Sequence, residues 1–368
     1  RGGSPRWDAV RRRISEAPYP SRSPEDNVAD LRAAVAANHR GARALRALCA
    51  EHGRDKVVRM MDALGDRAEG CVRKALQRLP QARCEAEERL DDGTPLRVRI
   101  DLSAPGARVD FGGTGPVHPG NLNATPAIVR SVVLYVLRLL VDEPLPLNEG
   151  LMRPVTLSIP EGLLNPPFPA DPVFAPAIVG GNVETSQRLV DVVLGALAQA
   201  LPGLIPAASQ GTMNNLAFGG VNPGTGREFT YYETLGGGTG GHPGGPGLAA
   251  IHSHMTNTRN TPIEVLEHDY PVLVERYAFR ENSGGTGAHP GGLGLIRDFR
   301  FLSEISVSLL TERRRHAPYG LAGGQPGDRG ENRLIKDKGQ EEILPEKVNL
   351  KLPADSLLSI RTPGGGGW

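Results

Sequence analysis

The chain has 368 residues, enough for a full hydrophobic core and, by length alone, for two or three domain-sized units. Its 42 Lys and Arg residues balance 41 Asp and Glu residues, and a net charge of +1 argues against nucleic-acid binding through overall charge. The 39% hydrophobic fraction is that of a globular protein, and 47 glycines with 32 prolines predict many loops.

Residues 1–95 are predicted to form a helical region. Ser23 to Asp26 read as a helix start, with a capping hydroxyl, a first-turn proline and two acids, and Gly53 is a suitable end. A second helix is expected over residues 55–79, before Pro80. Apolar residues recur at helical spacing in both, so we expect an amphipathic hairpin that packs on the rest of the protein.

Residues 96–235 are predicted to form a central mixed sheet with helices. Alternation between Leu96 and Leu102 indicates a strand, and the long apolar run after Thr125 indicates a buried helix. The expected strands are 96–102, 108–111, 154–159 and 229–235, and the expected helices are 125–141 and 182–201.

Residues 236–368 are predicted to form a glycine-rich, β-dominated part. Short alternating runs separated by glycine loops predict strands over 271–279, 294–301, 305–310 and 357–361. With helices early and strands late, the chain is expected to have an α+β (mixed α/β) fold.

A twelve-residue segment occurs twice in this last part. Residues 237–248 read GGTGGHPGGPGL and residues 284–295 read GGTGAHPGGLGL. Such loops can place backbone N–H groups around an anion, with glycines at positive φ, or they can be structural turns of a duplicated unit. As ligand contacts we take Gly240 and Gly287, with the adjacent His242 and His289.

The segment IHSHMTNTRNTPIEVLE, residues 251–267, contains two histidines two positions apart. On a strand, His252 and His254 would face the same side and could bind one divalent metal ion (Zn, Mn or Mg). Isolated histidines are more often structural, but an uncharged polar run follows this pair. We take His252, His254, Asn257, Asn260 and Glu264 as candidate catalytic residues.

Two further Asn–Glu groups lie next to glycine. Asn182, Glu184 and Thr185 stand at a predicted helix start, where N–H groups attract anions, although plain capping also explains them. Asn148 belongs to the second group, Asn-Glu-Gly. All four are candidate substrate-binding residues.

The cysteine and hydropathy patterns bear on location. Cys49, Cys71 and Cys84 form no C-x-x-C pair, which predicts free thiols in a reducing cytoplasm. The longest apolar stretch, residues 131–141, is too short to span a membrane, and no signal peptide is visible. We therefore expect a cytoplasmic protein that binds neither membranes nor nucleic acid.

Nucleotide-binding and hydrolase motifs are absent from the sequence. It contains no G-x-x-x-x-G-K-[ST] loop, no Rossmann fingerprint after a strand, no G-x-S-x-G elbow and no H-E-x-x-H. If the reaction uses ATP, this chain does not show the site that binds it.

Several long motifs resemble the hydantoinase B/5-oxoprolinase family, which includes acetone carboxylase-like subunits. The resemblance runs in the expected order from about residue 25 to the end. It rests on HSHMTNTRNTPIEVLEHDYPVLVERY (252–277), GGNVETSQRLVD (180–191), LNPPFPA (164–170), the Asn148–Gly150 turn, VDF (109–111) and TPGGGG (362–367).

This resemblance implies a division of labour between two components. A hydantoinase A/oxoprolinase A-like partner would bind ATP and activate a small substrate by phosphorylation. The B component would complete ring opening of a cyclic amide, or carboxylation in the acetone carboxylase branch. Metal ions assist in several members of the family.

The sequence departs from the family pattern in two places. The N-terminal Asn-Asp-Pro run and the Thr-His-x-x-Asp motif, thought to supply metal ligands, do not occur. The chain would then be the C-terminal portion of a subunit, a subunit completed by another polypeptide, or a degenerate paralogue. His289-Pro290 also replaces an Arg-Gly-Gly pattern, which would alter anion binding.

Three functions follow from the sequence. The first is the ring-opening component of an ATP-dependent cyclic-amide hydrolase, acting on a hydantoin, 5-oxoproline or a related lactam. The second is an acetone carboxylase-type subunit, for which turnover would depend on bicarbonate. The third is a non-catalytic paralogue that serves in assembly.

Overall fold

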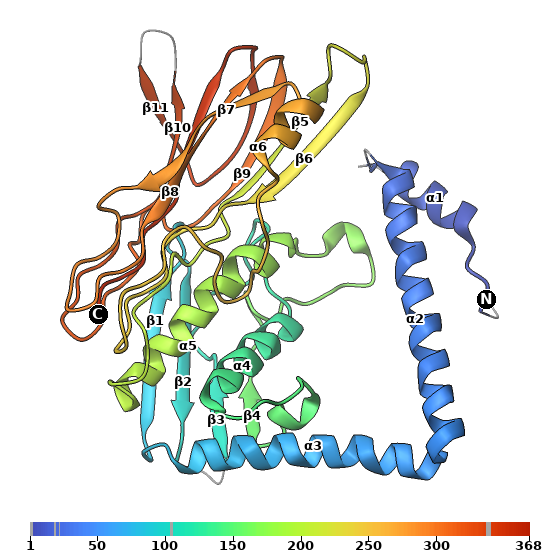
Figure 1. The fold of residues 1–368 in the computed structure, drawn as a ribbon, viewed down its shortest axis with the longest axis vertical. Coiled ribbons are helices and arrows are strands. Elements are labelled where there is room, and N and C mark those ends of the chain that lie inside the picture. Colours follow the sequence, from blue (N-terminus) through green and yellow to red (C-terminus); the bar gives the residue numbers. More distant parts are fainter. Residues whose placement is uncertain (1–2, 18–19, 22, 104–105, 336–339) are drawn as a thin grey trace. The chain divides into compact units, whose positions relative to one another are not determined.

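The fold is described by a computed structural model over residues 3–17, 20–21, 23–103, 106–335 and 340–368 (Figure 1). It contains helices and three β-sheets, which confirms the predicted mixed α/β class. The chain divides into two units, residues 1–68 and residues 69–368.

The first unit is helical, as the capping signals predict. It contains α1 (Trp7–Ser15), α2 (Pro24–His52) and the beginning of α3 (Arg54–Gln77), with Gly53 ending α2 at a φ of 82°. That the apolar faces of these helices pack on the rest of the protein stays a prediction. Large apolar side chains remain 44–56% exposed, namely Leu31, Leu45, Leu48, Val58, Met60, Met61 and Leu64.

The second unit begins with a four-stranded sheet in the order β1-β2-β3-β4. Only the β3–β4 pair is parallel. Helix α5 contacts β1 and β2, and helix α4 contacts α5, so that the two helices form a layer on this sheet (Figure 1). The elements are β1 (Arg83–Arg89), β2 (Pro95–Asp101), β3 (Ala107–Asp110), α4 (Pro126–Leu140), β4 (Val155–Ser158) and α5 (Ser186–Ala200).

Strand β1 corrects the expectation that residues 1–95 are helical. Its side chains alternate between buried and more exposed positions, and all seven residues pair with β2. Pairing with β2 therefore gives the backbone N–H and C=O groups of β1 the hydrogen bonds that a helix would have made within itself.

Three short segments complete this part of the chain. They are the 3₁₀ segments η1 (Glu149–Met152) and η2 (Pro172–Phe174) and the π turn η3 (Gly181–Thr185), which leads directly into α5.

The last part holds two further sheets. One has five strands in the order β11-β10-β13-β8-β7, and the other has four in the order β12-β9-β5-β6. Five of these elements, β5, β10, β11, β12 and α6, were not expected from the sequence. The elements are β5 (Asn215–Val221), β6 (Glu228–Thr234), α6 (Ile263–Asp269), β7 (Val272–Arg280), β8 (Gly294–Phe301), β9 (Ile305–Leu310), β10 (Glu331–Ile335), β11 (Glu341–Leu344), β12 (Lys347–Leu352) and β13 (Leu357–Arg361).

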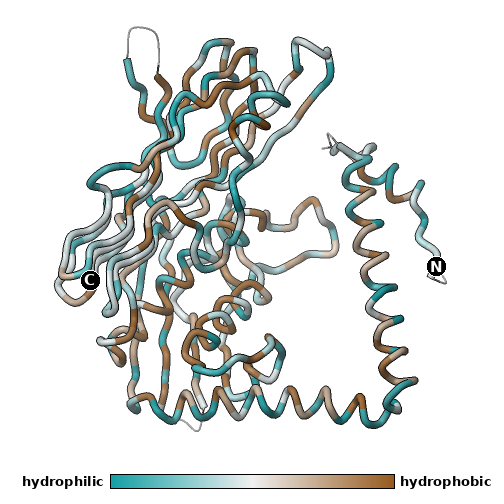
Figure 2. The backbone as a smooth tube through the Cα atoms, viewed as in Figure 1, coloured by the Kyte–Doolittle hydropathy of each residue, from teal (hydrophilic) through white to brown (hydrophobic). Residues whose placement is uncertain are grey.

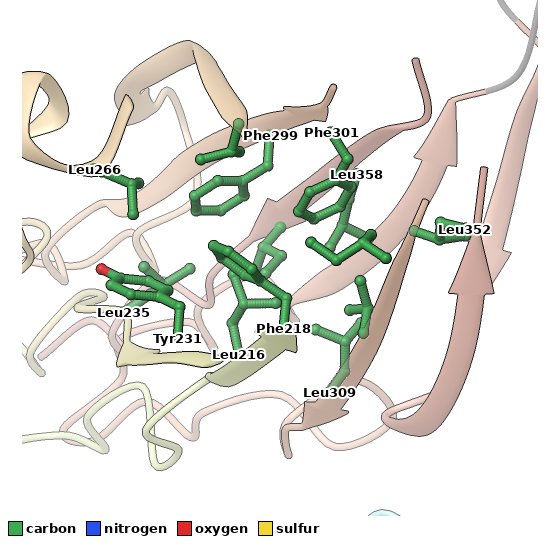
Figure 3. Close-up of a cluster of buried hydrophobic side chains, with 14 of the residues drawn as sticks. Leu216, Phe218, Tyr231, Leu235, Leu266, Phe299, Phe301, Leu309, Leu352 and Leu358 are labelled. Atoms are coloured by element: carbon green, nitrogen blue, oxygen red, sulfur yellow. The ribbon is translucent and has the colours of Figure 1, made fainter. Parts of the chain in front are cut away.

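An aromatic core joins these two sheets. Phe218 of β5 has its ring 6.4 Å from that of Phe299 and 5.4 Å from that of Phe301, both on β8 (Figure 3). All three side chains are buried, and each such burial stabilises the fold by about 1.5–3 kcal/mol. The four-stranded sheet therefore uses one face for the core, and its other face is available for polar residues.

The glycine segments pack against one another as extended chain, outside the sheets. We call residues 236–248, 283–293, 318–327 and 362–368 the glycine bundle. Figure 1 shows these segments side by side near the C-terminus, and they are pale in Figure 2 because glycine is neither strongly hydrophobic nor hydrophilic. Gly238 N–H donates to Pro363 O, and Gly365 N–H donates to Gly292 O.

Close approach explains why glycine is needed in this bundle. A Cβ at Gly238 would lie 1.9 Å from Gly292 O, and one at Gly365 would lie 1.9 Å from Thr239 O. The expectation of positive φ is wrong for the two repeats, since of their glycines only Gly245 has such a φ, 155°. The glycines therefore permit contact between backbones.

Candidate functional site

The sheet β12-β9-β5-β6 carries polar side chains on its outward face. Residues paired across the strands lie side by side, and residues two apart share a face. These pairings form two adjacent cross-strand rows, which we call the polar face. The first row is Lys347, Leu310, Asn215 and Thr234, and the second is Asn349, Ser308, Ala217 and Tyr232.

A cavity of about 760 Å³ lies over this face. Its other wall comes from Asn121, Val179 and Val183, the last of which belongs to the π turn η3. Pockets of 300–1,000 Å³ with a few polar groups among apolar ones are typical small-molecule sites, and π turns frequently occur at functional sites. The cavity is therefore the candidate functional site.

A chain of hydrogen bonds leads from the cavity to a buried carboxyl group. The Tyr232 hydroxyl donates to Asn215 Oδ1 (2.6 Å), and Asn215 Nδ2 donates to Glu184 Oε1 (2.6 Å), which also accepts from Met213 N–H (3.0 Å). Burial raises the pKa of Glu184 to about 8, and the nearby Glu312 carboxylate adds to this effect. A neutral Glu184 thus fixes the orientation of the Asn215 amide.

A second chain of polar contacts reaches the end of β6 from the predicted catalytic loop. His252 Nε2 lies 3.2 Å from Thr258 Oγ1, which lies 2.9 Å from Thr234 Oγ1. Burial lowers the pKa of His252, so that its imidazole is neutral near pH 7. His252 Nδ1 is buried and has no hydrogen-bond partner among the described residues.

Asn260 attaches the same loop to strand β6. Its Nδ2 donates to Glu233 Oε2 (3.0 Å) and to Thr234 O (2.8 Å), and its Oδ1 accepts from the Tyr277 hydroxyl (3.1 Å). Asn260 therefore positions the loop, since all of these contacts are within the protein.

His254 is held inside the protein. Its Nδ1 lies 3.1 Å from the Tyr135 hydroxyl and its Nε2 lies 3.6 Å from Asp191 Oδ1. Its backbone has a φ of 57°, in a turn that Gln187 fixes by donating to Ser253 O (3.0 Å). A non-glycine residue in this region is strained, and the polar contacts around it offset that strain.

Asp191 connects His254 to a network of buried charges. Burial opposes its ionisation, but the contacts with His254 and Arg313 outweigh burial and hold its pKa below the ordinary value. Buried charges that remain paired avoid a large desolvation cost. The ion pairs are Asp191–Arg313 (2.9 Å), Arg313–Glu88 (3.0 Å), Glu88–Arg188 (2.7 Å), Arg188–Glu312 (3.6 Å) and Glu312–Lys347 (2.7 Å), and Lys347 is itself on the polar face.

Among the described residues, His252 and His254 belong to no group of three or more possible metal ligands. The expected strand is wrong here, because His252 lies in a loop and His254 in a turn, and each contacts different partners. Where the chain is described, no group of three or more His, Cys, Asp or Glu residues could hold a metal ion. The divalent ion stays a prediction from the sequence, and this pair offers it no complete ligand set.

The other sequence candidates fall into separate places. Thr185 donates to Leu122 O (2.6 Å), and Asn148 accepts from Gly150 N–H (2.9 Å), so both fix local backbone. Asn182, Asn257 and Glu264 are exposed, and none of the three lines the cavity described above.

The repeat residues lie in the glycine bundle. A Cβ at Gly240 would lie 1.9 Å from Ala207 O, and one at Gly287 would lie 2.6 Å from Trp368 O. His242 accepts a bond from Gly244 N–H (3.1 Å), while the His289 and Trp368 backbones pair with each other. These contacts account for the residues structurally, and their binding of anions stays a prediction.

Sequence reasoning missed all residues of the polar face. Asn215, Ser308 and Lys347 stand at alternating positions of strands, which is the ordinary pattern of a solvated face. Only the pairing of β12, β9, β5 and β6 shows that they share a cavity. The available signal was polar alternation in ISVSL (305–309) and KVNLK (347–351), which by itself indicates strands rather than a site.

Comparison with known proteins decides the family. The hydantoinase B/oxoprolinase family model matches residues 1–368. The chain belongs to the hydantoinase B/oxoprolinase family. It is 42% identical over 361 residues to 5-oxoprolinase 1 of Arabidopsis thaliana, covering 94% of this chain and 27% of that protein. The chain spans 27–28% of the length of several curated relatives.

Solved structures share the fold of this hydantoinase B/oxoprolinase chain. An ATP-dependent caprolactamase from Pseudomonas jessenii has a TM-score of 0.84 at 22% identity, covering all of this chain and 64% of that one. A nucleotide-free acetone carboxylase has a TM-score of 0.75 at 15% identity, covering 92% of this chain and 52% of that one.

No helix among the described residues is long and apolar enough to cross a membrane.

Proposed function

We propose that the chain is part of the ring-opening component of an ATP-dependent cyclic-amide hydrolase. Its relatives include proteins named 5-oxoprolinase, at 42% identity for one from Arabidopsis thaliana and 39% for one from Dictyostelium discoideum. The observation that carries the proposal is the cavity over the polar face. It offers hydroxyl and amide groups, which suit the N–H and C=O of a lactam, beside aliphatic wall residues.

In this proposal, phosphorylation takes place on a partner. A hydantoinase A-like subunit would bind ATP and transfer phosphate to the lactam carbonyl oxygen. Water would then add to the activated carbon, and the ring C–N bond would break with a proton passing to nitrogen, which leaves an acyl phosphate. A second water would hydrolyse this acyl phosphate and release inorganic phosphate. These steps consume one ATP and two waters for each ring opened.

The polar face would orient the ring for this attack. Tyr232 and Asn215 would hydrogen-bond the amide, while Glu184 fixes Asn215. His252 is neutral near pH 7 and has an unpartnered nitrogen, so it is suited to accept a proton from water. His254, Asn260 and the Asp191 network would act as positioning groups for the 252–262 loop.

The test is an assay of the native protein that contains this chain, purified with its co-purifying subunits. We expect 5-oxoproline, hydantoin or caprolactam to stimulate ADP release, with an equal amount of ring-opened product. Bicarbonate-dependent consumption of a ketone would instead support the carboxylase alternative, for which the fold shared with acetone carboxylase is the observation. Absence of both reactions in the complete complex would favour the assembly subunit.

A further inference from the structure

Strand β8 carries a fully buried cation that makes no hydrogen bond to the described residues. Arg297 has an exposed fraction of 0%, and its Nε, Nη1 and Nη2 atoms all lack a hydrogen-bond partner there. Most buried polar groups in proteins do have such a partner, and burying a charge without one is costly. A charge kept at this cost calls for a role beyond filling space in the core.

Two aromatic rings and one carboxylate surround the Arg297 guanidinium. Its Cζ lies 4.6 Å from the centre of the Tyr277 ring and 5.2 Å from that of the Phe299 ring, close enough for each ring face to attract a cation. Its Nε lies 3.3 Å from Glu233 Oε1, and both of these side chains are almost fully buried. The rings and the carboxylate therefore hold the guanidinium in one place.

The Glu233 carboxylate divides its two oxygens between Arg297 and the 252–262 loop. Oε1 faces Arg297, whereas Oε2 accepts from Asn260 Nδ2 (3.0 Å) and from the Tyr231 hydroxyl (2.9 Å). Burial raises the pKa of Glu233, and Arg297 acts against that rise by favouring the ionised form. Because an ionised acceptor makes stronger hydrogen bonds than a neutral one, Arg297 strengthens the attachment of Asn260.

Tyr277 provides a second connection between Arg297 and the loop. Its ring face lies against Arg297, and its hydroxyl donates to Asn260 Oδ1 (3.1 Å). Both polar atoms of the Asn260 amide thus contact a side chain that Arg297 holds in place. The same loop carries His252, whose Nε2 contacts Thr258 Oγ1 (3.2 Å).

We infer that Arg297 and Glu233 are positioning residues, which act through Asn260 to place the 252–262 loop and, with it, His252. The inference rests on the proposed function and deepens it, because His252 is the group suited to accept a proton there. Neither Arg297 nor Glu233 lines the cavity, so we expect them to affect the reaction step rather than binding of the ligand.

The test replaces the ion pair by apolar residues of similar size, as Arg297→Met with Glu233→Leu, in the native complex that contains this chain. Removing both charges together leaves no unpaired buried charge, and such replacements often retain stability. Arg297→Lys is the conservative variant. Arg300→Met is the matched control, because Arg300 lies on the same strand and pairs with Glu275 in a more exposed position.

Modification of His252 by diethyl pyrocarbonate, mapped by peptide mass, measures the state of the loop without an activity assay. The reagent attacks neutral imidazole, which is the form of His252 near pH 7. His268, with an exposed side chain, gives the reference rate in the same sample. We expect the double variant to modify His252 about tenfold faster than the native protein, because the loop opens more often.

The other variants separate the role of the charge from general damage. Arg297→Lys and Arg300→Met should keep the His252 rate within about twofold of the native rate. In turnover, the double variant should lose about tenfold in kcat, while KM stays within about twofold. If the double variant does not fold, Arg297→Met alone serves in its place, since a buried Glu233 can take up a proton when its partner is removed.

An unchanged His252 rate in the double variant would overturn the inference, as would an equal rise in Arg300→Met. A loss in KM rather than in kcat would also contradict it, because the pair would then act on ligand binding. Faster modification of His252 in a complex that opens no lactam ring would support the positioning role and count against the proposed function.

Discussion

The glycine bundle and the polar face show two different uses of groups that commonly bind ligands. In the bundle, backbone N–H groups donate to neighbouring carbonyls and the glycines permit contacts closer than a Cβ would allow. On the polar face, ordinary strand residues surround a cavity of about 760 Å³. The glycine-rich repeat thus allows backbones to pack closely. A polar sheet face with a cavity over it, in contrast, indicates a ligand site.

The largest effect is expected from a methyl group in the glycine bundle. Gly238→Ala places Cβ 1.9 Å from Gly292 O, and backbone on both sides prevents a small adjustment. We expect a loss of at least about 3 kcal/mol in the free energy of unfolding, measured by denaturant titration.

Gly203→Ala is the matched control for that variant, because nothing lies within 4 Å of its added Cβ. It should change stability by less than about 1 kcal/mol. Equal stability of the two variants would contradict close packing of the glycine bundle. Anion binding would then be the better explanation of its glycines.

The next effect concerns Glu184 and pH. Because burial raises the pKa of this group to about 8, the folded protein retains a proton that the unfolded chain loses near its ordinary pKa of 4.5. The contribution of protonated Glu184 to the free energy of unfolding is therefore fully present below pH 4.5. It is lost as the pH rises toward 8, by up to about 1.4 kcal/mol per pH unit.

Glu184→Gln should remove this dependence while it keeps the acceptor for Asn215. Denaturation curves at several pH values between 5 and 8 would measure the free energy of unfolding of both proteins. The stability of Glu184→Gln relative to the native protein should increase as the pH rises. Parallel pH profiles for the two proteins would contradict a neutral Glu184.

The smallest effect is expected from the hydroxyl group of Tyr232. Tyr232→Phe removes the donor to Asn215 Oδ1, and a hydrogen bond of this kind contributes about 1 kcal/mol. We expect KM for the lactam to rise about fivefold with little change in stability.

Tyr277→Phe is the control, because its hydroxyl also donates to an amide oxygen, that of Asn260, but outside the cavity. Its KM should stay within about twofold of the native value. If Tyr277→Phe raised KM more than Tyr232→Phe, the binding site would have to be moved from the polar face to the 252–262 loop.

Local signals in the sequence predicted much of the fold. The proline and acids after Ser23 begin α2, and the alternation around Val98 marks β2. Strands β10 and β12 could not be predicted in the same way, because their stability depends on neighbours that are distant in the chain. Propensity is weak where tertiary pairing decides the structure.

The site was harder to predict for a related reason. The pattern of polar residues led to Glu184 and His252, whose contacts reach Asn215 and Thr234 at the β5–β6 end of the site. It could not predict that His254 would turn away toward Tyr135 and Asp191, since a positive φ breaks the two-residue period of a strand. Lys347 and Tyr232 come together only through sheet pairing, which no short motif records.

Hydrogen–deuterium exchange with and without saturating 5-oxoproline tests the central claim most directly, because the ligand should protect the segments that surround it. We predict protection in peptides that cover residues 213–217, 230–234 and 345–350. Protection confined to residues 237–248 and 284–295, or no protection in the native complex, would contradict the assignment of the ligand site to the polar face.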